Sequence, residues 1–301
     1  MAKIIKDWIL PIAMIVGALT YRWISVLAPL TPYLIFLMLL LTFSKISIRD
    51  IRFHRAHLWL LMIQLVCSLA IYYLLAGYDV ILAQGAMLCL LAPTATAAAV
   101  ITGLLGGNVG FLTAYTLFCN IAVAIAAPVW FTLTGAGAGA GAGADEMTFM
   151  QSVWLICRKV FPLLIMPLFI AAFINRFLPK VRKALIYIPK MAFYLWVAAL
   201  TIVTGVIVDF LVNNQTTDLK TEIGLVIISM ILCCLQFFVG RKIGRRYGDP
   251  ISSGQGLGQK NTILAIWMAN TWLHPLTALA PACYILWQNI INTWQLNIKK
   301  Q

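Results

Sequence analysis

The residues best suited to bind a small polar molecule lie in one short stretch, 252–261, which reads SSGQGLGQKN. It places two carboxamides and an amine, Gln255, Gln259 and Lys260, directly before the apolar run 262–273. A lysine at the centre of a membrane span costs about 2.5–3.5 kcal/mol on insertion scales unless it faces protein or water. Three glycines also interrupt the stretch, although backbone in lipid must satisfy its own hydrogen bonds. We therefore expect a binding site here.

The composition places this stretch in a membrane protein. Of the 301 residues, 62% are hydrophobic and only 10% are charged, and runs of about 20 apolar residues recur along the chain. The predicted class is an all-α polytopic membrane protein that contacts the lipid bilayer. The seven cysteines fall in apolar segments without a C-x-x-C motif or Cys/His pairing, so we expect no metal site.

We expect ten transmembrane helices, separated by short polar or Gly/Pro segments. Their approximate ranges are 8–26, 29–46, 57–76, 80–104, 108–133, 154–177, 184–211, 220–241, 251–273 and 276–297. A Gly/Ala-rich linker at 135–148 divides the chain into a first five-helix repeat, 1–134, and a second, 149–301. Because five is odd, the second repeat enters the membrane from the opposite face, which predicts an inverted repeat.

The basic residues are distributed unequally between the two faces of this topology. Seventeen of the 22 Lys and Arg residues fall on the face that holds both termini, and four fall on the other. The positive-inside rule makes the richer face cytoplasmic. The net charge of +13 is then a topological signal, and we expect no nucleic-acid partner.

An inverted repeat predicts that the span matching 251–273 is also interrupted. That span, 80–104, contains Pro93, which lacks a backbone donor and pushes the preceding residue away from helical angles. Paired interruptions at matching positions point to the binding site of a transporter. We expect Thr94 and Thr96 to offer hydroxyl and helix-terminal N–H groups to a substrate. The alternative is a proline kink in one helix and a glycine-rich packing surface in the other.

With these features the chain resembles the bile acid:sodium symporter family. The resemblance implies ten spans in two inverted repeats, with interrupted helices four and nine that cross. It also implies a panel of spans 1, 2, 6 and 7 and a core of spans 3–5 and 8–10. The family's span-four motif, approximately P-G-G-T-A-S-N, aligns with 93–99, where Ala98 and Ala99 replace the serine and asparagine that supply sodium ligands.

The family's span-nine motif, approximately E-x-x-x-Q-N, aligns with the stretch described first. Gln255 replaces its glutamate, Gln259 matches its glutamine and Lys260 replaces its asparagine. The resemblance also matches Gln64 to a span-three glutamine and Thr116 to a span-five threonine ligand. Since much of the oxygen-rich ligand set is missing, we expect both sodium sites of the family to be absent or weakened.

Lys260 leads to a specific hypothesis. Its ammonium takes over the electrostatic role of a sodium ion at the crossing, where it hydrogen-bonds to exposed carbonyls and to Gln259 or Gln64. Together with the helix N-termini after each interruption, this charge favours an organic anion. The same amine can bind and release a proton. The alternative is that Lys260 extends toward the cytoplasmic face.

The expected function is a secondary transporter of an organic anion, bile-acid-like or a small carboxylate, in a bacterial inner membrane with both termini cytoplasmic. Alternating access without sodium coupling is expected; proton coupling and facilitated diffusion stay open, and no cofactor is expected. The expected substrate-binding residues are Thr94, Thr96, Gln255, Gln259, Lys260 and Asn261, with Gln64, Ala98, Ala99 and Thr116 as neighbours or ion-site remnants. A non-transporting membrane receptor or sensor for an organic anion is the alternative. We expect no enzyme, because no Asp, Glu or His lies mid-span.

Overall fold

The structure is a computed structural model that describes residues 12–45, 52–95, 97–135, 148–186, 189–213 and 219–300. In these ranges it is helical throughout, with one isolated β-bridge and no other strand pairing. The predicted all-α polytopic class is confirmed, since six helical stretches are long and apolar enough to cross a membrane. These stretches are Tyr21–Ser44, Arg55–Leu75, Val109–Leu133, Phe149–Phe177, Met191–Asn213 and Leu219–Arg246. The count of ten spans and the inverted repeat stay predictions.

The chain divides into two compact units. Unit 1 consists of Met1–Lys45 and Met166–Asp218, and unit 2 consists of Ile46–Ile165 and Leu219–Gln301. Helix α8, Phe149–Phe177, contributes to both. The predicted division at the Gly/Ala-rich linker concerns sequence repeats and stays a prediction, because residues 136–147 lie outside the described part of the chain.

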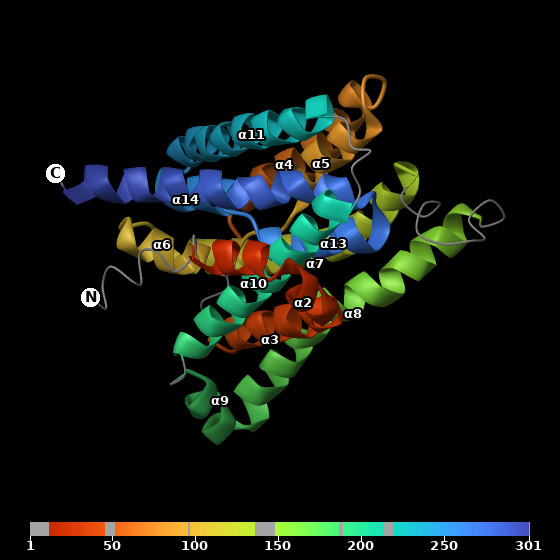
Figure 1. Cartoon of the computed structure of the whole chain (residues 1–301). Coiled ribbons are helices and arrows are strands. Elements are labelled where there is room, and N and C mark those ends of the chain that lie inside the picture. Colours follow the sequence, from red (N-terminus) through yellow and green to blue (C-terminus); the bar gives the residue numbers. More distant parts are fainter. Residues whose placement is uncertain are drawn as a thin grey trace. The chain divides into compact units, whose positions relative to one another are not determined.

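Unit 1 is built around α10. Its helical elements are residues 12–19, α2 (Tyr21–Ile24), η1 (Ser25–Leu30), α3 (Thr31–Ser44), the end of α8, α9 (Pro179–Ile186) and α10 (Pro189–Asn213). Helix α10 packs against α2, η1 and α3, and α9 packs against α3 (Figure 1). The closest approaches involve glycines: a Cβ on Gly17 would meet Thr201, and one on Gly205 would meet Ile24. Small residues at helix contacts let membrane helices approach closely.

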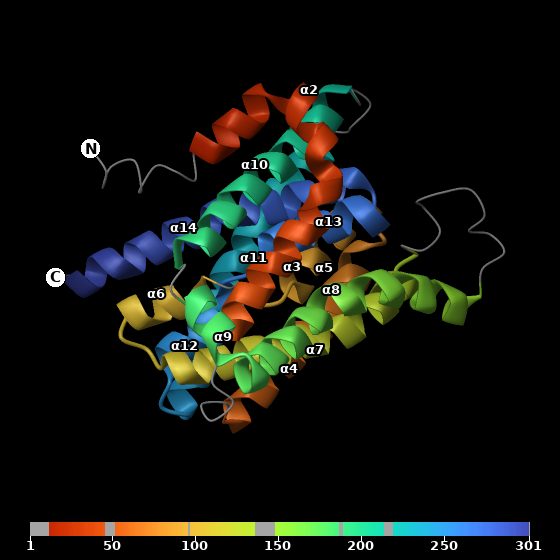
Figure 2. The same ribbon diagram turned by 90° about the horizontal axis from the view of Figure 1, so that it is seen from below.

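Unit 2 holds every candidate site residue. Its elements are α4 (Arg55–Leu75), α5 (Val80–Leu91), α6 (Ala98–Leu104), α7 (Val109–Leu133), the start of α8, α11 (Leu219–Arg246), α12 (Pro250–Gly258), α13 (Thr262–Trp272), η4 (Pro275–Ala278) and α14 (Leu279–Lys300). Helix α11 packs along α12 and α14, and α4 packs along α5 (Figures 1 and 2).

Both predicted interruptions are present in unit 2. Helix α5 ends at Leu91, and the next residue, Ala92, has the extended angles (φ −48°, ψ 135°) that a following proline favours. Helix α12 ends at Gly258, and Gln259 is likewise extended, with φ −95° and ψ 105°. The side chain of Asn261 then starts α13, where its oxygen accepts from Leu264 N at 3.3 Å.

The three glycines of the span-nine stretch do not end the helix, contrary to the expectation that they break it. Gly254 and Gly256 lie inside α12, and Gly258 is its last residue. A Cβ on Gly256 would lie 2.8 Å from the Tyr115 ring, and one on Gly258 would lie 2.5 Å from the Phe237 ring. The glycines therefore form a packing surface, and the helix stops only after them. This span therefore contains both a helix interruption and a glycine-rich packing surface, which the sequence had offered as alternatives.

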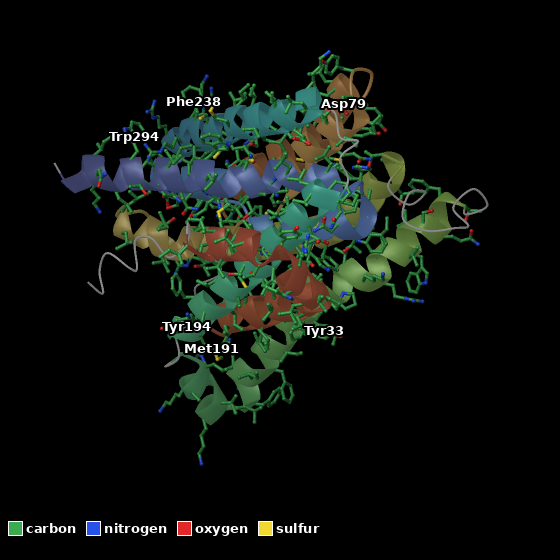
Figure 3. All side chains as sticks on the ribbon, in the orientation of Figure 1. Tyr33, Asp79, Met191, Tyr194, Phe238 and Trp294 are labelled. Carbon is green, nitrogen blue, oxygen red and sulfur yellow. The ribbon has the colours of Figure 1, made fainter. Side chains whose placement is uncertain are left out.

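The outer sides of several helices carry large apolar side chains. Phe238 of α11 and Trp294 of α14 are 62% and 60% exposed in the isolated chain (Figure 3). Tyr33 and Tyr194 of unit 1 are exposed to a similar degree. Surfaces of this kind are stable in contact with lipid and would be costly in water.

Candidate functional site

The two interruptions lie side by side in unit 2. Thr94 and Lys260 form the isolated antiparallel bridge. On its two sides, Ala95 N donates to Gln259 O at 2.9 Å and Asn261 N donates to Pro93 O at 2.7 Å. We call residues 93–95 and 259–261 the crossing. It joins stretches more than 160 positions apart, and it satisfies backbone groups that the helices leave unpaired.

The C-terminal end of α5 depends on side chains from elsewhere. An α-helix leaves its last carbonyls without intrahelical partners, and these carry partial negative charge. The Nζ of Lys260 donates to Leu90 O at 2.9 Å. The amide of Gln64 donates to Leu91 O at 3.0 Å and Ala92 O at 3.1 Å. An ammonium and a carboxamide therefore cap this helix end from outside.

Two further contacts complete the cap. The amide of Gln236 on α11 donates to Cys89 O at 3.1 Å, an interhelical hydrogen bond to the same end of α5. The oxygen of Gln64 accepts from the Tyr115 hydroxyl at 2.9 Å and from the Cys119 thiol at 3.4 Å. Gln64 is thus held with its donors toward α5 and its oxygen away from it.

Lys260 is one of the largest fully buried side chains of the described residues, with 1% exposure. It does not extend toward the membrane face, so that alternative is wrong. No Asp or Glu appears among the buried residues in the described ranges. The ammonium is therefore held by a helix end and not by a carboxylate, and one of its three N–H groups is used in the bond to Leu90.

The C-terminal end of α12 is capped by neutral groups. The Thr94 hydroxyl donates to Gly256 O at 2.8 Å, and the Tyr284 hydroxyl donates to Gly258 O at 2.7 Å. Lys260 N, which in a continuous helix would bond to Gly256, instead donates to Gln288 Oε1 at 2.9 Å. Thr94 therefore holds the two interruptions together, and its hydroxyl hydrogen is already committed.

Gln255 and Gln259 lie one helical turn apart. The amide of Gln255 donates to Asn292 Oδ1 at 3.0 Å and Gln295 Oε1 at 3.1 Å, both on α14. Within the described chain, Gln259 Oε1 is buried without a hydrogen-bond partner. The α14 partners were not predicted from the sequence. Their signal was available: polar residues at 288, 292 and 295 recur at helical spacing in an apolar segment.

Among the described residues, the side chains of Ala98, Ala99 and Thr116 do not join this bonding network. Thr96 lies outside the described residues. Ala98 is buried at the start of α6, Ala99 is half-buried, and neither side chain carries an oxygen. The Thr116 hydroxyl donates to Leu112 O of its own helix at 2.9 Å. No group of three or more His, Cys, Asp or Glu residues able to hold a metal ion occurs in the described residues.

Comparison with known proteins identifies the family. No curated protein matches the chain. The family model described as the sodium bile acid symporter family matches residues 31–214, more than half of the 301 residues. The matched region includes α5, Pro93 and Gln64 and ends before α11, so it does not reach Lys260. On this match, and on its apolar helices, the chain is a multi-pass membrane protein that belongs to the sodium bile acid symporter family.

Proposed function

We propose that this protein is a secondary transporter that moves an organic anion, bile-acid-like or a small carboxylate, by alternating access and without sodium coupling. It would do so in a bacterial inner membrane with both termini cytoplasmic. Ten spans in two inverted repeats, 1–134 and 149–301, would form the fold. Family membership and the apolar helices support the transport class. Sodium independence and the anionic substrate are inferred from the crossing.

The observation that carries sodium independence is the bond from Lys260 Nζ to Leu90 O at 2.9 Å. Sodium binding at a helix end requires several free oxygens. Here each carbonyl from Cys89 to Pro93 already accepts a hydrogen bond, and the donors are Gln236, Lys260, Gln64 and the Asn261 amide. A sodium ion would have to displace these donors and approach a fixed ammonium. The alanines at 98 and 99 offer no replacement oxygen.

The same charge supports an anionic substrate. Two helix C-termini, of α5 and α12, and two helix N-termini, of α6 and α13, meet around the crossing. Their partial charges, roughly −0.5 and +0.5 at each type of end, oppose one another. A protonated Lys260 therefore leaves the crossing with an excess of positive charge, and no buried carboxylate in the described residues offsets it. A substrate carboxylate or sulfate would do so.

Roles differ among the residues proposed for the substrate site. Lys260 has unused N–H groups and Gln259 has an unpartnered oxygen, so these two are the proposed substrate contacts. Thr94 and Asn261 are proposed to hold the crossing in shape, since the Thr94 hydroxyl donates to Gly256 O of α12 and the Asn261 side-chain oxygen accepts from Leu264 N of α13. Gln255 is proposed to fix α12 against α14.

Uptake by purified protein in liposomes tests the proposal. A bile acid and several small carboxylates are supplied in sodium or choline buffer, at two pH values. We expect uptake of at least one anion that is the same in both buffers and is lost in Lys260→Ala. Lys299→Ala is the matched control, because Lys299 is an exposed lysine that also caps a helix end, at Leu104 O. Uptake that requires sodium would contradict the proposal, and binding without uptake would favour the receptor alternative.

A converse substitution tests the sodium argument directly. In Gln255→Glu, a buried carboxylate would face Asn292 Oδ1 and Gln295 Oε1, which now accept from the Gln255 amide. With Asn292 and Gln295 in their present amide orientations, three oxygens would then meet without a donor, an arrangement that a cation stabilises. We expect sodium to raise the melting temperature of Gln255→Glu and to leave that of the wild type unchanged. Equal sodium stabilisation of both proteins would show that an ion site is already present.

A further inference from the structure

Helix α14 has two sharply different faces. Ile290, Trp294 and Ile298 lie at helical spacing and are more than half exposed. Figure 3 labels Trp294. Gln288 and Asn292, two positions before Ile290 and Trp294, lie on the opposite face and are at most 6% exposed. An apolar outer face suits lipid. The polar inner face requires partners inside the protein.

The inner face of α14 meets the side chains of α12. We call five buried carboxamides, three on α14 and two in or directly after α12, the carboxamide cluster. They are Gln255, Gln259, Gln288, Asn292 and Gln295, none more than 6% exposed. The described contacts within it are those from Gln255 to α14 and from Lys260 N to Gln288. The cluster contains no charged side chain, and all its members can both donate and accept.

Three buried atoms of the cluster have no hydrogen-bond partner among the described residues: Gln255 Oε1, Gln259 Oε1 and Asn292 Nδ2. Each unpaired group costs about 1–3 kcal/mol. Exchanging the oxygen and nitrogen positions of Gln255 and Asn292 together still leaves one donor and one acceptor unpaired. The cluster therefore needs a molecule that donates and accepts at once.

The cluster is elongated along α14. At one end Gln288 contacts the crossing through Lys260 N, and toward the other lies Gln295. Beyond it, the exposed Lys299 donates to Leu104 O at the end of α6. From position 288 to 299 the helix rises about 16 Å. A continuous polar face thus runs from the crossing to an exposed end of the helix.

We propose that the carboxamide cluster lines a narrow track of water molecules that leads from the Lys299 end of α14 to the crossing. Water suits the cluster because it supplies donors and acceptors together and bridges neutral amides at little cost. A cation would find acceptors but would approach the ammonium of Lys260 and the donors of neighbouring amides. The track brings water to the crossing from one end of the helix while the opposite face of α14 stays in lipid.

Cysteine accessibility tests the track in lipid nanodiscs. Asn292→Cys and Gln295→Cys are made in a variant in which the seven native cysteines are replaced, and are treated with a charged, membrane-impermeant thiol reagent. Because only the thiolate reacts, a cysteine in lipid should react much more slowly than one in water. Ile290→Cys on the outer face is the slow control, and Lys299→Cys at the exposed end is the fast one. We expect both cluster cysteines to react faster than Ile290→Cys and more slowly than Lys299→Cys, because the narrow track slows entry of the reagent. Rates as slow as that of Ile290→Cys would overturn the proposal.

A second measurement needs no substitution and is independent of transport. X-ray radiolysis of bound water oxidises side chains that touch it, even buried ones. Tyr284 and Tyr115 are both fully buried in unit 2, but only Tyr284 lies on α14, one turn before Gln288. We expect oxidation of Tyr284 and not of Tyr115. No oxidation of Tyr284, or equal oxidation of both, would contradict a track confined to α14.

Discussion

The ends of α5 and α12 meet at the same crossing but are stabilised by different chemistry. The carbonyls of α5 accept from three long side chains, one of them the ammonium of Lys260. The carbonyls of α12 accept from two hydroxyls and a backbone N–H, all neutral. At both ends the last carbonyls of an interrupted helix have no intrahelical partner, in a place where no water or lipid partner is assured. Side chains from other parts of the chain supply the missing donors.

The difference shows where this protein places charge. A neutral cap satisfies a carbonyl and leaves the electrostatic field of the crossing unchanged, whereas an ammonium satisfies a carbonyl and adds a full positive charge. Only the α5 end receives that charge. If the crossing takes its anion preference from Lys260, damage to the α5 cap should affect both stability and transport. Damage to the α12 cap should affect mainly stability.

Gln64→Leu should give the largest loss of stability. It removes the donor to Leu91 O and Ala92 O and the acceptor of the Tyr115 hydroxyl and the Cys119 thiol, so four buried groups lose a partner. At about 1–3 kcal/mol for each group, the free energy of unfolding should fall by about 3 kcal/mol or more. Thermal melting in detergent measures it. The control is Met62→Leu, a half-exposed position on the same helix, which should change little.

Lys260→Met should have a smaller effect on stability than Gln64→Leu and a larger effect on transport. The Leu90 carbonyl loses its only described side-chain donor, at about 1–3 kcal/mol, while loss of the buried charge offsets part of that cost. Paired melting and uptake assays check the two effects together. Unchanged uptake of an anion by a folded Lys260→Met protein would show that the charged cap of α5 is not needed for transport. The proposed difference between the α5 and α12 ends would then be wrong.

Tyr284→Phe tests the neutral cap. It removes the donor to Gly258 O and one of the two acceptors of the Gln236 amide, which keeps Cys89 O. We expect a loss of about 1–2 kcal/mol and anion uptake within about twofold of the wild type, because no charge changes. A loss of uptake as large as that of Lys260→Ala, in a folded protein, would show that the α12 cap carries function too.

Thr94→Val should have the smallest effect. Valine keeps the shape of threonine but cannot donate to Gly256 O, while the two backbone bonds beside the Thr94–Lys260 bridge remain. The expected loss is about 1 kcal/mol. A matched Thr116→Val variant removes only a bond to its own helix, at Leu112 O, and should cost less. An equal cost for both would mean that the crossing gains nothing from the Thr94 hydroxyl.

Several features of the site followed from residue chemistry before any tertiary information. Pro93 predicted the first interruption because it cannot donate to the helix. Lys260 in an apolar segment predicted a buried polar partner, and the structure supplies the Leu90 carbonyl. Gln259 and Asn261 were expected at the binding site, and they lie in the irregular segment between α12 and α13. In each case the prediction followed from the free-energy cost of placing a polar or non-helical residue in a membrane span.

The identities of the partners could not be obtained in this way. Nothing local pairs Gln64 with Leu91, Lys260 with Leu90 or Gln255 with Asn292, since these contacts join helices far apart in sequence. The glycines of α12 were misjudged for the same reason: their spacing fits both a broken helix and a close-packed one, and only the neighbouring Tyr115 and Phe237 rings distinguish the two.

Composition, apolar length and the positions of proline and lysine were enough for the class of protein and for the two places where its helices stop. These are properties of single segments in a bilayer, set by the cost of unpaired backbone and unpaired charge. Which helix end receives the ammonium, and which face of α14 carries the carboxamides into the interior, depended on how α4, α11, α12 and α14 pack. Packing brings together donors and acceptors that no local pattern connects.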